Sequence, residues 1–316
     1  MHGVFLDRGS LGDDGVDFSG FDQALPRWQY HHATPPDEVA RRIAAARVVV
    51  TNKVAVDADA MAGAKHLRLV CVIATGTNNI DMDAARRLGV TVCNVPGYAT
   101  NSVVQLVYAL LLALYTHLPE YHQAVRDGRW QRSEQFCLLD YPIHELAGKV
   151  MGIVGYGELG RAVGHVAAAF GMEVVIAEGV GGRLPGRVPL ARLLPRVDVL
   201  SLHCPLTPQT RGLIGERELS RMKPTAVLIN TARGGIVDEA ALARALRDGV
   251  IAGAGVDVLT QEPPAAGNPL LASEVPNLIL TPHIAWASLE ARQRLVDEVT
   301  RNISAFLAGR PRNVVV

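Results

Sequence analysis

The chain of 316 residues lacks the features that would direct it to a large charged partner or into a membrane. Its 31 basic and 31 acidic side chains cancel, so no excess charge is available to attract nucleic acid or an anionic lipid surface. No apolar run is long enough to cross a bilayer. The most apolar segment, residues 106 to 115, is short and predicts a helix buried in a core or a subunit interface. A small molecule is therefore the expected partner.

Cysteine is scarce, and the four residues present are far apart: Cys71, Cys93, Cys137 and Cys204. Without a C-x-x-C pair they suggest neither a disulfide framework nor a metal knuckle, and they fit a reducing cytoplasm. The ten histidines show no metal-ligand spacing, so we expect no metal. The first residues show no signal-peptide pattern, which also favours a cytoplasmic location.

Short β-branched segments alternate with helical segments in the first hundred residues. The predicted strands are residues 4–7, 47–52, 67–74 and 90–95. Helical segments such as "DMDAARRLG" lie between them, and this one ends on Gly89, as a helix C-terminus often does. Alternation of this kind predicts parallel βαβ units. The segment "VPGYATNS" breaks the pattern, and two helices divided near Pro119 are expected after it.

A second series of alternating elements begins at Lys149. Its predicted strands are residues 149–157, 173–178, 197–203, 226–232, 251–258 and 277–283. Six nearly continuous apolar strands require helices on both faces of a parallel sheet, so the fold class is α/β and doubly wound. A last helix, roughly residues 288–309, is expected to return to the first domain.

A glycine-rich turn opens this second series. Gly155, Gly157 and Gly160 have G-x-G-x-x-G spacing, with an apolar strand before them and a helix after. The first glycine allows a tight turn, the second lets a pyrophosphate approach the backbone, and the third permits close packing of helix and strand. Glu178 follows the next strand at the distance typical of a ribose-binding acid. The pattern predicts a dinucleotide-binding domain.

The same acid indicates which dinucleotide is preferred. A carboxylate at Glu178 accepts hydrogen bonds from the adenosine ribose and repels a 2′-phosphate, which favours NAD(H). Arg183 and Arg187 follow in a loop that could bring either cation to a 2′-phosphate, so NADP(H) is not excluded.

Three ionisable residues each follow a predicted strand of this domain: Arg233 in "NTARGG", Glu262 in "DVLTQEPP" and His283 in "LTPHIAWAS". The C-terminal ends of parallel strands line one crevice, so we expect these residues to meet. A guanidinium suits bidentate capture of a carboxylate, and histidine exchanges protons near neutral pH. A carboxylate beside that histidine would stabilise the imidazolium and fix its ring. Because hydride delivery to a carbonyl carbon requires a proton for the oxygen, this set suits reduction of a keto acid.

Five motifs in order carry a family resemblance: "GYGELG", "HCPLTPQTRGLIG", "MKPTAVLINTARGGIVDEAAL", "GAGVDVLTQEPP" and "LTPHIAWAS". Over residues 67–290 they resemble the NAD-dependent D-isomer-specific 2-hydroxyacid dehydrogenase family. Within it, "ATGTNNIDMDAARRLGV" and "VPGYATNSVVQLVYALLLAL" are most similar to glycerate dehydrogenases, also called hydroxypyruvate reductases.

The resemblance implies a Rossmann dinucleotide-binding domain, residues 99–286, inserted in a flavodoxin-like substrate domain, residues 1–98 and 287–316. It implies a homodimer built on the helices after Ser102. It implies catalytic roles for Arg233, Glu262 and His283, and contacts from the Thr75 and Gly76 amides to the substrate carboxylate. The implied cofactor-binding residues are Gly155, Gly157, Glu158, Leu159, Gly160, Glu178, Cys204, Pro205, Thr231, Ala232 and Asp257.

The sequence leaves the substrate open. Glycerate with hydroxypyruvate, or glyoxylate, fits the resemblance best, and Trp286 is either a core residue or a wall of the substrate pocket. A formate or phosphite oxidoreductase on the same scaffold would share the cofactor motifs. A non-enzymatic NAD sensor is the other alternative, because a fold does not dictate its function.

Overall fold

The computed structural model describes residues 2–12, 14–179 and 184–316. The chain forms two compact units. Unit 1 consists of residues 1–99 and 287–316, and unit 2 of residues 100–286.

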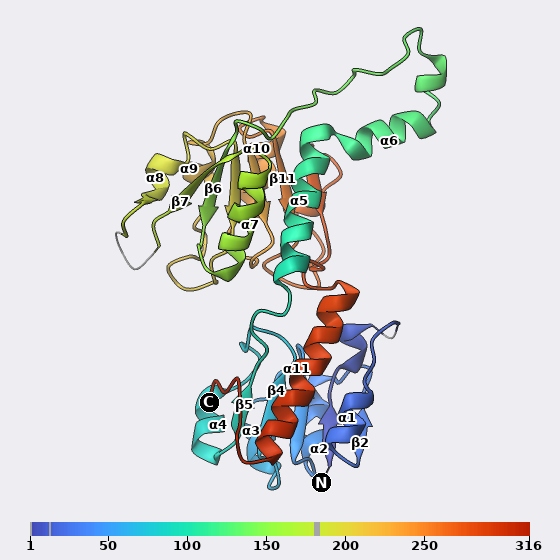
Figure 1. Ribbon diagram of the computed structural model, residues 1–316, viewed down its shortest axis with the longest axis vertical. Coiled ribbons are helices and arrows are strands. Elements are labelled where there is room, and N and C mark those ends of the chain that lie inside the picture. Colours follow the sequence, from blue (N-terminus) through green and yellow to red (C-terminus); the bar gives the residue numbers. More distant parts are fainter. Residues whose placement is uncertain (1, 13, 180–183) are drawn as a thin grey trace. The chain divides into compact units, whose positions relative to one another are not determined.

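Unit 1 is a parallel sheet of five strands in the order β2-β1-β3-β4-β5 (Figure 1). The strands are β1 (Gly3–Phe5), β2 (Trp28–Tyr30), β3 (Val48–Thr51), β4 (Leu69–Val72) and β5 (Thr91–Cys93). One face packs against α2 (Val39–Ile43), α3 (Ala58–Gly63) and α4 (Met82–Leu88), and the other against α1 (Ser19–Ala24) and α11 (Leu289–Leu307). Helix α4 shows why such short helices form: the Asp81 side chain caps its start, and Gly89, with φ of 65°, ends it.

Strand β2 was not predicted. Its sequence "WQY" is three residues long and partly exposed at the edge of the sheet, so it lacks the apolar run that marks the inner strands. Its first residue, Trp28, ties the strand to α1, because the indole Nε1 donates to the Phe21 carbonyl over 2.8 Å. The Trp28 ring also stacks on Tyr30, the last residue of the strand.

Unit 2 is a parallel sheet of seven strands in the order β12-β11-β10-β9-β6-β7-β8. The strands are β6 (Val150–Val154), β7 (Glu173–Ala177), β8 (Arg187–Val188), β9 (Val199–Leu202), β10 (Val227–Asn230), β11 (Gly253–Val256) and β12 (Leu278–Leu280). Six of them coincide with predicted segments; the two-residue edge strand β8 was not predicted, because two residues carry no periodic signal.

Helices cover both faces of this sheet, as near-continuous apolar strands require. On one face lie α5 (Thr100–Thr116) and α7 (Glu158–Ala169), side by side in Figure 1. On the other face, α8 (Leu190–Leu193), α9 (Glu216–Leu219) and α10 (Glu239–Arg247) enclose the larger core cluster.

A projecting arm, residues 117–145, leaves this unit after α5. The chain breaks at His117, with φ of 49°, and continues as α6 (Leu118–Arg126) and the 3-10 turn η3 (Trp130–Arg132) before an irregular return (Figure 1). In the described part of the chain, no single helix is long and apolar enough to cross a membrane; α5 and α6 pass that test only as a pair, bent by 60°.

Candidate active site

The glycine loop lies where the strand order of unit 2 reverses. Strand β6 has β7 on one side and β9 on the other, and the loop of residues 155–157 leaves β6 at this point. In open α/β sheets, ligands bind outside the carboxyl ends of the strands at such a reversal. The loop leads into the twelve-residue helix α7, whose first N–H groups and dipole favour an anion.

Packing explains why the three glycines are present. A Cβ at Gly155 would lie 2.5 Å from the backbone N of Cys204, and one at Gly160 would lie 2.1 Å from the Gly155 oxygen. A Cβ at Gly157 would meet no protein atom within 4 Å. The first and third glycines are thus required by the fold, whereas the second leaves its backbone open to a ligand. This is the arrangement that a pyrophosphate needs, and the residues fit a dinucleotide.

The other cofactor candidates lie around this loop or at neighbouring strand ends. Glu178 follows β7, is half-buried, and its N–H donates to the Val188 oxygen over 2.9 Å. The buried Thr231 hydroxyl is one of the side-chain atoms that have no hydrogen-bond partner in the described structure. Burial raises the pKa of the Cys204 thiol, which favours its protonated form. The Glu158 carboxylate accepts from the Thr100 hydroxyl over 2.5 Å.

The remaining candidates differ in exposure: Ala232 is buried, Leu159 half-buried and Pro205 exposed. Arg187 begins β8 beside the end of β7. Arg183 lies outside the described residues. Among the residues described, no three His, Cys, Asp or Glu side chains gather as a metal ion would require.

Two of the three ionisable residues are in direct contact. His283 follows β12, Glu262 follows β11, and these two strands are neighbours. The Nδ1 atom of His283 lies 2.6 Å from Oε2 of Glu262, while Oε1 of Glu262 accepts the Leu259 N–H over 2.9 Å. The side chains keep 26% and 36% of their surface exposed. The imidazole is therefore oriented by a carboxylate and still accessible to a substrate.

Arg233 lies at the end of the next strand, β10, in an exposed position. Its Nη1 donates to the Ala232 oxygen over 2.6 Å, and the Asn230 side chain braces the turn by donating to the Arg233 oxygen over 3.1 Å. Gly234 follows, and a Cβ there would lie 1.9 Å from the Leu259 oxygen. Because only glycine permits this approach, the turn that carries Arg233 packs directly on the segment that leads to Glu262.

Asp257 holds the backbone of His283. The N–H of His283 donates to the Asp257 carbonyl over 2.8 Å, and the buried Asp257 carboxylate accepts the N–H groups of Ile284 and Ala285, each over 2.9 Å. The Thr281 hydroxyl donates to the same carboxylate over 2.5 Å. Burial raises the pKa of Asp257, opposed by these hydrogen bonds.

The hydrogen bonds to Asp257 stabilise a strained backbone at His283. Its φ of 54° is a left-handed conformation that costs about 1 kcal/mol or more for residues other than glycine. The sequence gives no sign of these hydrogen bonds, because they depend on how the loop after β12 folds back. A carboxylate has about four acceptor sites, so Asp257 keeps capacity for one further donor.

His203, directly before Cys204, is a half-buried histidine that opens the motif "HCPLTPQTRGLIG" but received no role from the sequence. Its Nε2 lies 2.8 Å from the Ser201 hydroxyl, and its buried Nδ1 is without a partner in the described structure. Burial of the ring lowers the pKa of His203 to about 4 from its ordinary 6.5. Between these values the unfolded chain takes up a proton that the folded protein does not, so stability falls as the pH is lowered.

We expect this effect in equilibrium unfolding. Between pH 7 and pH 5, the free energy of unfolding should fall by about 2 kcal/mol more in the unmodified protein than in His203→Gln, at about 1.4 kcal/mol for each pH unit below 6.5. Urea titrations of both proteins at the two pH values measure the difference. Equal losses in the two proteins would show that His203 is not held neutral by burial.

The remaining substrate candidates belong to different units of the chain. Thr75 and Gly76 belong to unit 1, after β4, where the exposed Thr75 donates its hydroxyl to the Val95 oxygen over 2.8 Å. Trp286 is the last residue of unit 2 and is half-buried.

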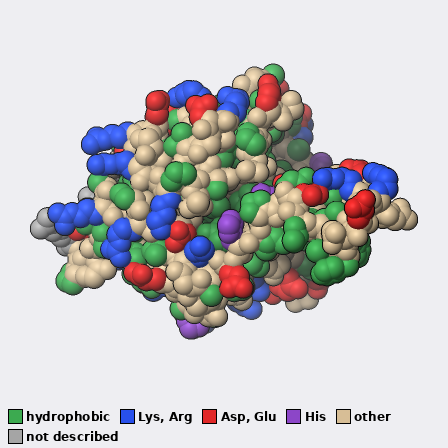
Figure 2. Space-filling model, turned by 90° about the horizontal axis from the view of Figure 1, so that it is seen from above, with side chains coloured by type: hydrophobic (Ala, Val, Ile, Leu, Met, Phe, Trp, Pro, Cys, Tyr) green, Lys and Arg blue, Asp and Glu red, His purple; other side chains and the backbone are tan. Residues whose placement is uncertain are grey.

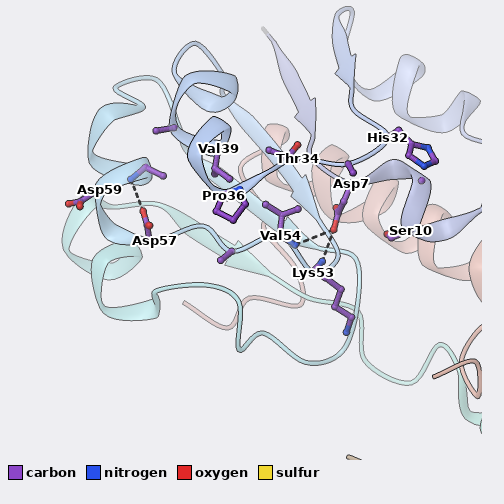
Figure 3. A pocket seen from close by; sticks show the side chains of 15 residues that line it. Asp7, Ser10, His32, Thr34, Pro36, Val39, Lys53, Val54, Asp57 and Asp59 are labelled. Carbon is purple, nitrogen blue, oxygen red and sulfur yellow. Dashed lines mark hydrogen bonds between the residues drawn. The ribbon is translucent and has the colours of Figure 1, made fainter. Parts of the chain in front are cut away.

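Unit 1 contains a cavity of about 790 Å³ at its own strand-order reversal, between β1 and β3 (Figure 3). Asp7 lines this cavity, and its carboxylate accepts the N–H groups of Asn52, Lys53 and Val54 over 2.8, 2.7 and 3.2 Å. The donors that would hold a phosphate here are bound to a side chain of the protein. The glycine loop of unit 2 is therefore the better dinucleotide site.

The fold and the glycine loop together define a dinucleotide-binding protein of the doubly wound class. Residues 108–285 match the family model described as D-isomer specific 2-hydroxyacid dehydrogenase, NAD binding domain. A glycerate dehydrogenase of Methylorubrum extorquens is 46% identical over 312 residues, which cover 99% of this chain and 98% of that protein.

Two solved structures are similar over their whole length and that of this chain, each with a TM-score of 0.87. One is a protein from Thermus thermophilus, 35% identical, and the other is an acyclic imino acid reductase in complex with NADPH and D-Arg, 28% identical. This chain belongs to the D-isomer specific 2-hydroxyacid dehydrogenase family. It is an oxidoreductase of 2-hydroxy acids that uses a nicotinamide dinucleotide, and the predicted family and fold class are confirmed.

Proposed function

We propose that the protein reduces a small 2-keto acid to the D-2-hydroxy acid with NADH, with hydroxypyruvate or glyoxylate as the preferred substrate. The observation that carries the proposal is the 2.6 Å contact of His283 with Glu262 at the end of one strand pair, with Arg233 at the end of the adjoining strand. A proton donor and a carboxylate anchor are the two groups that a keto-acid reductase requires.

Each residue of the trio has one task in this proposal. The Arg233 guanidinium binds the substrate carboxylate, and the Thr75 and Gly76 amides are candidates for further donors to it. The Glu262 carboxylate stabilises the protonated His283 ring through Nδ1, and His283 donates its Nε2 proton to the carbonyl oxygen, which leaves the ring neutral. When bound, the reduced nicotinamide supplies the hydride. Residues of the glycine loop, with Glu178, Cys204, Pro205, Thr231, Ala232 and Asp257, would hold the dinucleotide.

NADH is favoured over NADPH because Glu178 stands directly after β7, where an acid meets the adenosine ribose. The 2′-phosphate of NADPH would lie against that carboxylate. Arg187 on β8 is the described cation closest in sequence that could offset the repulsion. The small substrate is favoured by the similarity to a glycerate dehydrogenase along nearly the whole chain.

The experiment that tests the proposal is oxidation of NADH and of NADPH in the presence of hydroxypyruvate, glyoxylate, pyruvate, oxaloacetate and phenylpyruvate. We expect the highest kcat/KM for NADH with one of the first two acids. Activity with larger acids only would overturn the substrate assignment, and no oxidation with any acid would favour a dinucleotide sensor.

We further propose that the active form is a homodimer in which the projecting arm covers a second copy. In the described part of the chain, the arm exposes large apolar side chains: Phe136 keeps 89% of its surface exposed, Leu139 80% and Leu118 62%. Figure 2, which looks onto the α6 end, shows hydrophobic side chains on the projecting lobe. Exposed apolar area of this extent on one segment is typical of a protein interface.

A variant that carries both Phe136→Ser and Leu139→Ser should be shifted from dimer to monomer. Each lost apolar contact weakens association by about 1.5 to 3 kcal/mol, and symmetry counts each of the two twice. The total is about 6 kcal/mol or more, so the dissociation constant should rise at least about 10⁴-fold. Sedimentation velocity measures it, with Leu88→Ser, an exposed leucine of α4, as the control. A variant that stays dimeric, or an unmodified protein that is monomeric, would contradict this interface.

A further inference from the structure

Glu239, the first residue of α10, extends its carboxylate away from its own helix to a neighbouring loop. Oε1 accepts the backbone N–H of Thr260 over 2.5 Å, and Oε2 accepts from the Asn268 side-chain amide over 2.8 Å. Thr260 and Asn268 are the two ends of an exposed loop, residues 260–268, and Glu262 lies within it. A single carboxylate therefore ties both ends of the loop that carries Glu262.

Burial of apolar side chains does little to fix this loop. Residues 261–267 are exposed, so apolar burial does not set their position. Directly before the loop, Leu259 donates its N–H to Oε1 of Glu262. The Leu259 oxygen lies so near Gly234 that a Cβ at that glycine would be only 1.9 Å away. A movement of the backbone at Leu259 and Thr260 would therefore displace Glu262 from His283 and disturb the turn that carries Arg233.

An ordinary role for Glu239 would be to stabilise the start of α10 through the helix dipole. That end of the helix is already capped, because the Asp238 side chain accepts the Ala241 N–H over 2.9 Å. A solvated first-turn acid would have no reason to take two donors at hydrogen-bond distance from another segment. The direction of the carboxylate, toward the loop, separates it from a simple capping acid.

We propose that Glu239 is a positioning residue for the reaction: it fixes loop 260–268 and thereby keeps the Glu262 carboxylate on Nδ1 of His283. The inference rests on the proposed function of the trio, and it adds a residue that does not itself touch the substrate. Glu239 acts through the chain Thr260, Leu259 and Glu262, and its effect appears in the orientation of the His283 ring.

Removal of the carboxylate in Glu239→Ala leaves the Thr260 N–H and the Asn268 amide without their acceptor. Glu262 then samples orientations in which its contact with His283 is lost, and proton transfer becomes misaligned. We expect kcat to fall between about 10- and 100-fold, since displacements of about 1 Å have effects of this size. NADH binding should change less than about twofold. The glycine loop follows β6, and β9 lies between that strand and β10, after which α10 begins. In Glu239→Gln, the amide oxygen can still accept from Thr260, so the loss should be smaller than in Glu239→Ala.

The test compares Glu239→Ala, Glu239→Gln and the control Glu216→Ala in the full-length protein. Glu216 is also the first residue of a helix in unit 2, and its exposed carboxylate lies 3.3 Å from Arg244, so it controls for the loss of a first-turn acid. The measurements are kcat and KM with the best keto acid, NADH binding by fluorescence, and thermal unfolding. The fourth is the proton NMR signal of His283 Nδ1–H in the cofactor-free protein, assigned with His283→Gln.

A fall of kcat in Glu239→Ala, with partial recovery in Glu239→Gln and a shifted or broadened His283 signal, would support the proposal. An unchanged His283 signal, or a loss of kcat equal in the Ala, Gln and Glu216 variants, would overturn it. If Glu239→Ala unfolds at the assay temperature, the Gln variant decides by the same two readouts. The trio is tested separately: full activity in His283→Gln would refute the proposed function itself, whatever the Glu239 variants do.

Discussion

Replacement of His283 by alanine should lower kcat for keto-acid reduction by between about 10² and 10⁴-fold, the range that a positioned general acid contributes. The structure gives this side chain the two properties of such a group: its Nδ1 is held at 2.6 Å by Glu262, and about a quarter of its surface is exposed. Stopped-flow or steady-state absorbance of NADH measures the rate.

NADH binding is the control for this substitution. The imidazole lies at the end of β12, four strands away from β6 and the glycine loop, so the dissociation constant for NADH should change less than about threefold. A His283→Ala protein that retains more than about a tenth of kcat, or one that loses NADH affinity and turnover equally, would remove His283 from the role of proton donor. His283→Gln keeps a polar group of similar size and should be almost as inactive.

Replacement of Arg233 by alanine should lower kcat/KM for the keto acid at least about 100-fold, chiefly through KM. A charged, hydrogen-bonded partner of a carboxylate contributes about 3 kcal/mol or more when one side is truncated, and about 1.4 kcal/mol corresponds to each factor of ten. Some loss of kcat is also expected, because the same cation polarises the carbonyl. Titration of each rate against keto-acid concentration separates the two terms.

Arg233→Lys distinguishes charge from geometry. The guanidinium forms a planar fork that fits both carboxylate oxygens, whereas an ammonium is a point charge, so lysine should restore only part of the lost kcat/KM. Full restoration by lysine would show that the charge alone is sufficient. An unchanged KM in Arg233→Ala would contradict its role as the carboxylate anchor.

The architecture could be predicted because its signals are local. Apolar runs such as residues 226–232 give inner strands, and alternation with helices gives parallel order. The edge strands β2 and β8 were missed for the complementary reason: three and two partly exposed residues contain no period to detect. The glycine spacing was informative because steric demands at Gly155 and Gly160 are imposed by the strands and helix on either side.

The site was predictable only to the level of strand ends. Parallel order places the residues after β10, β11 and β12 at one edge, which is why Arg233, Glu262 and His283 could be named together. How Asp257 and Glu239 hold them could not be foreseen. Their partners lie 21 to 29 positions away along the chain, and whether those atoms meet depends on loop conformations that no short motif encodes.

The most direct test of the central claim is the configuration of the product formed from hydroxypyruvate with NADH. Chiral chromatography of the reaction mixture, run beside His283→Ala, identifies the glycerate that forms. We predict D-glycerate in amounts equal to the NADH consumed, and almost none with the variant. L-glycerate, a racemic product, or no glycerate with this or any other small 2-keto acid would contradict the account.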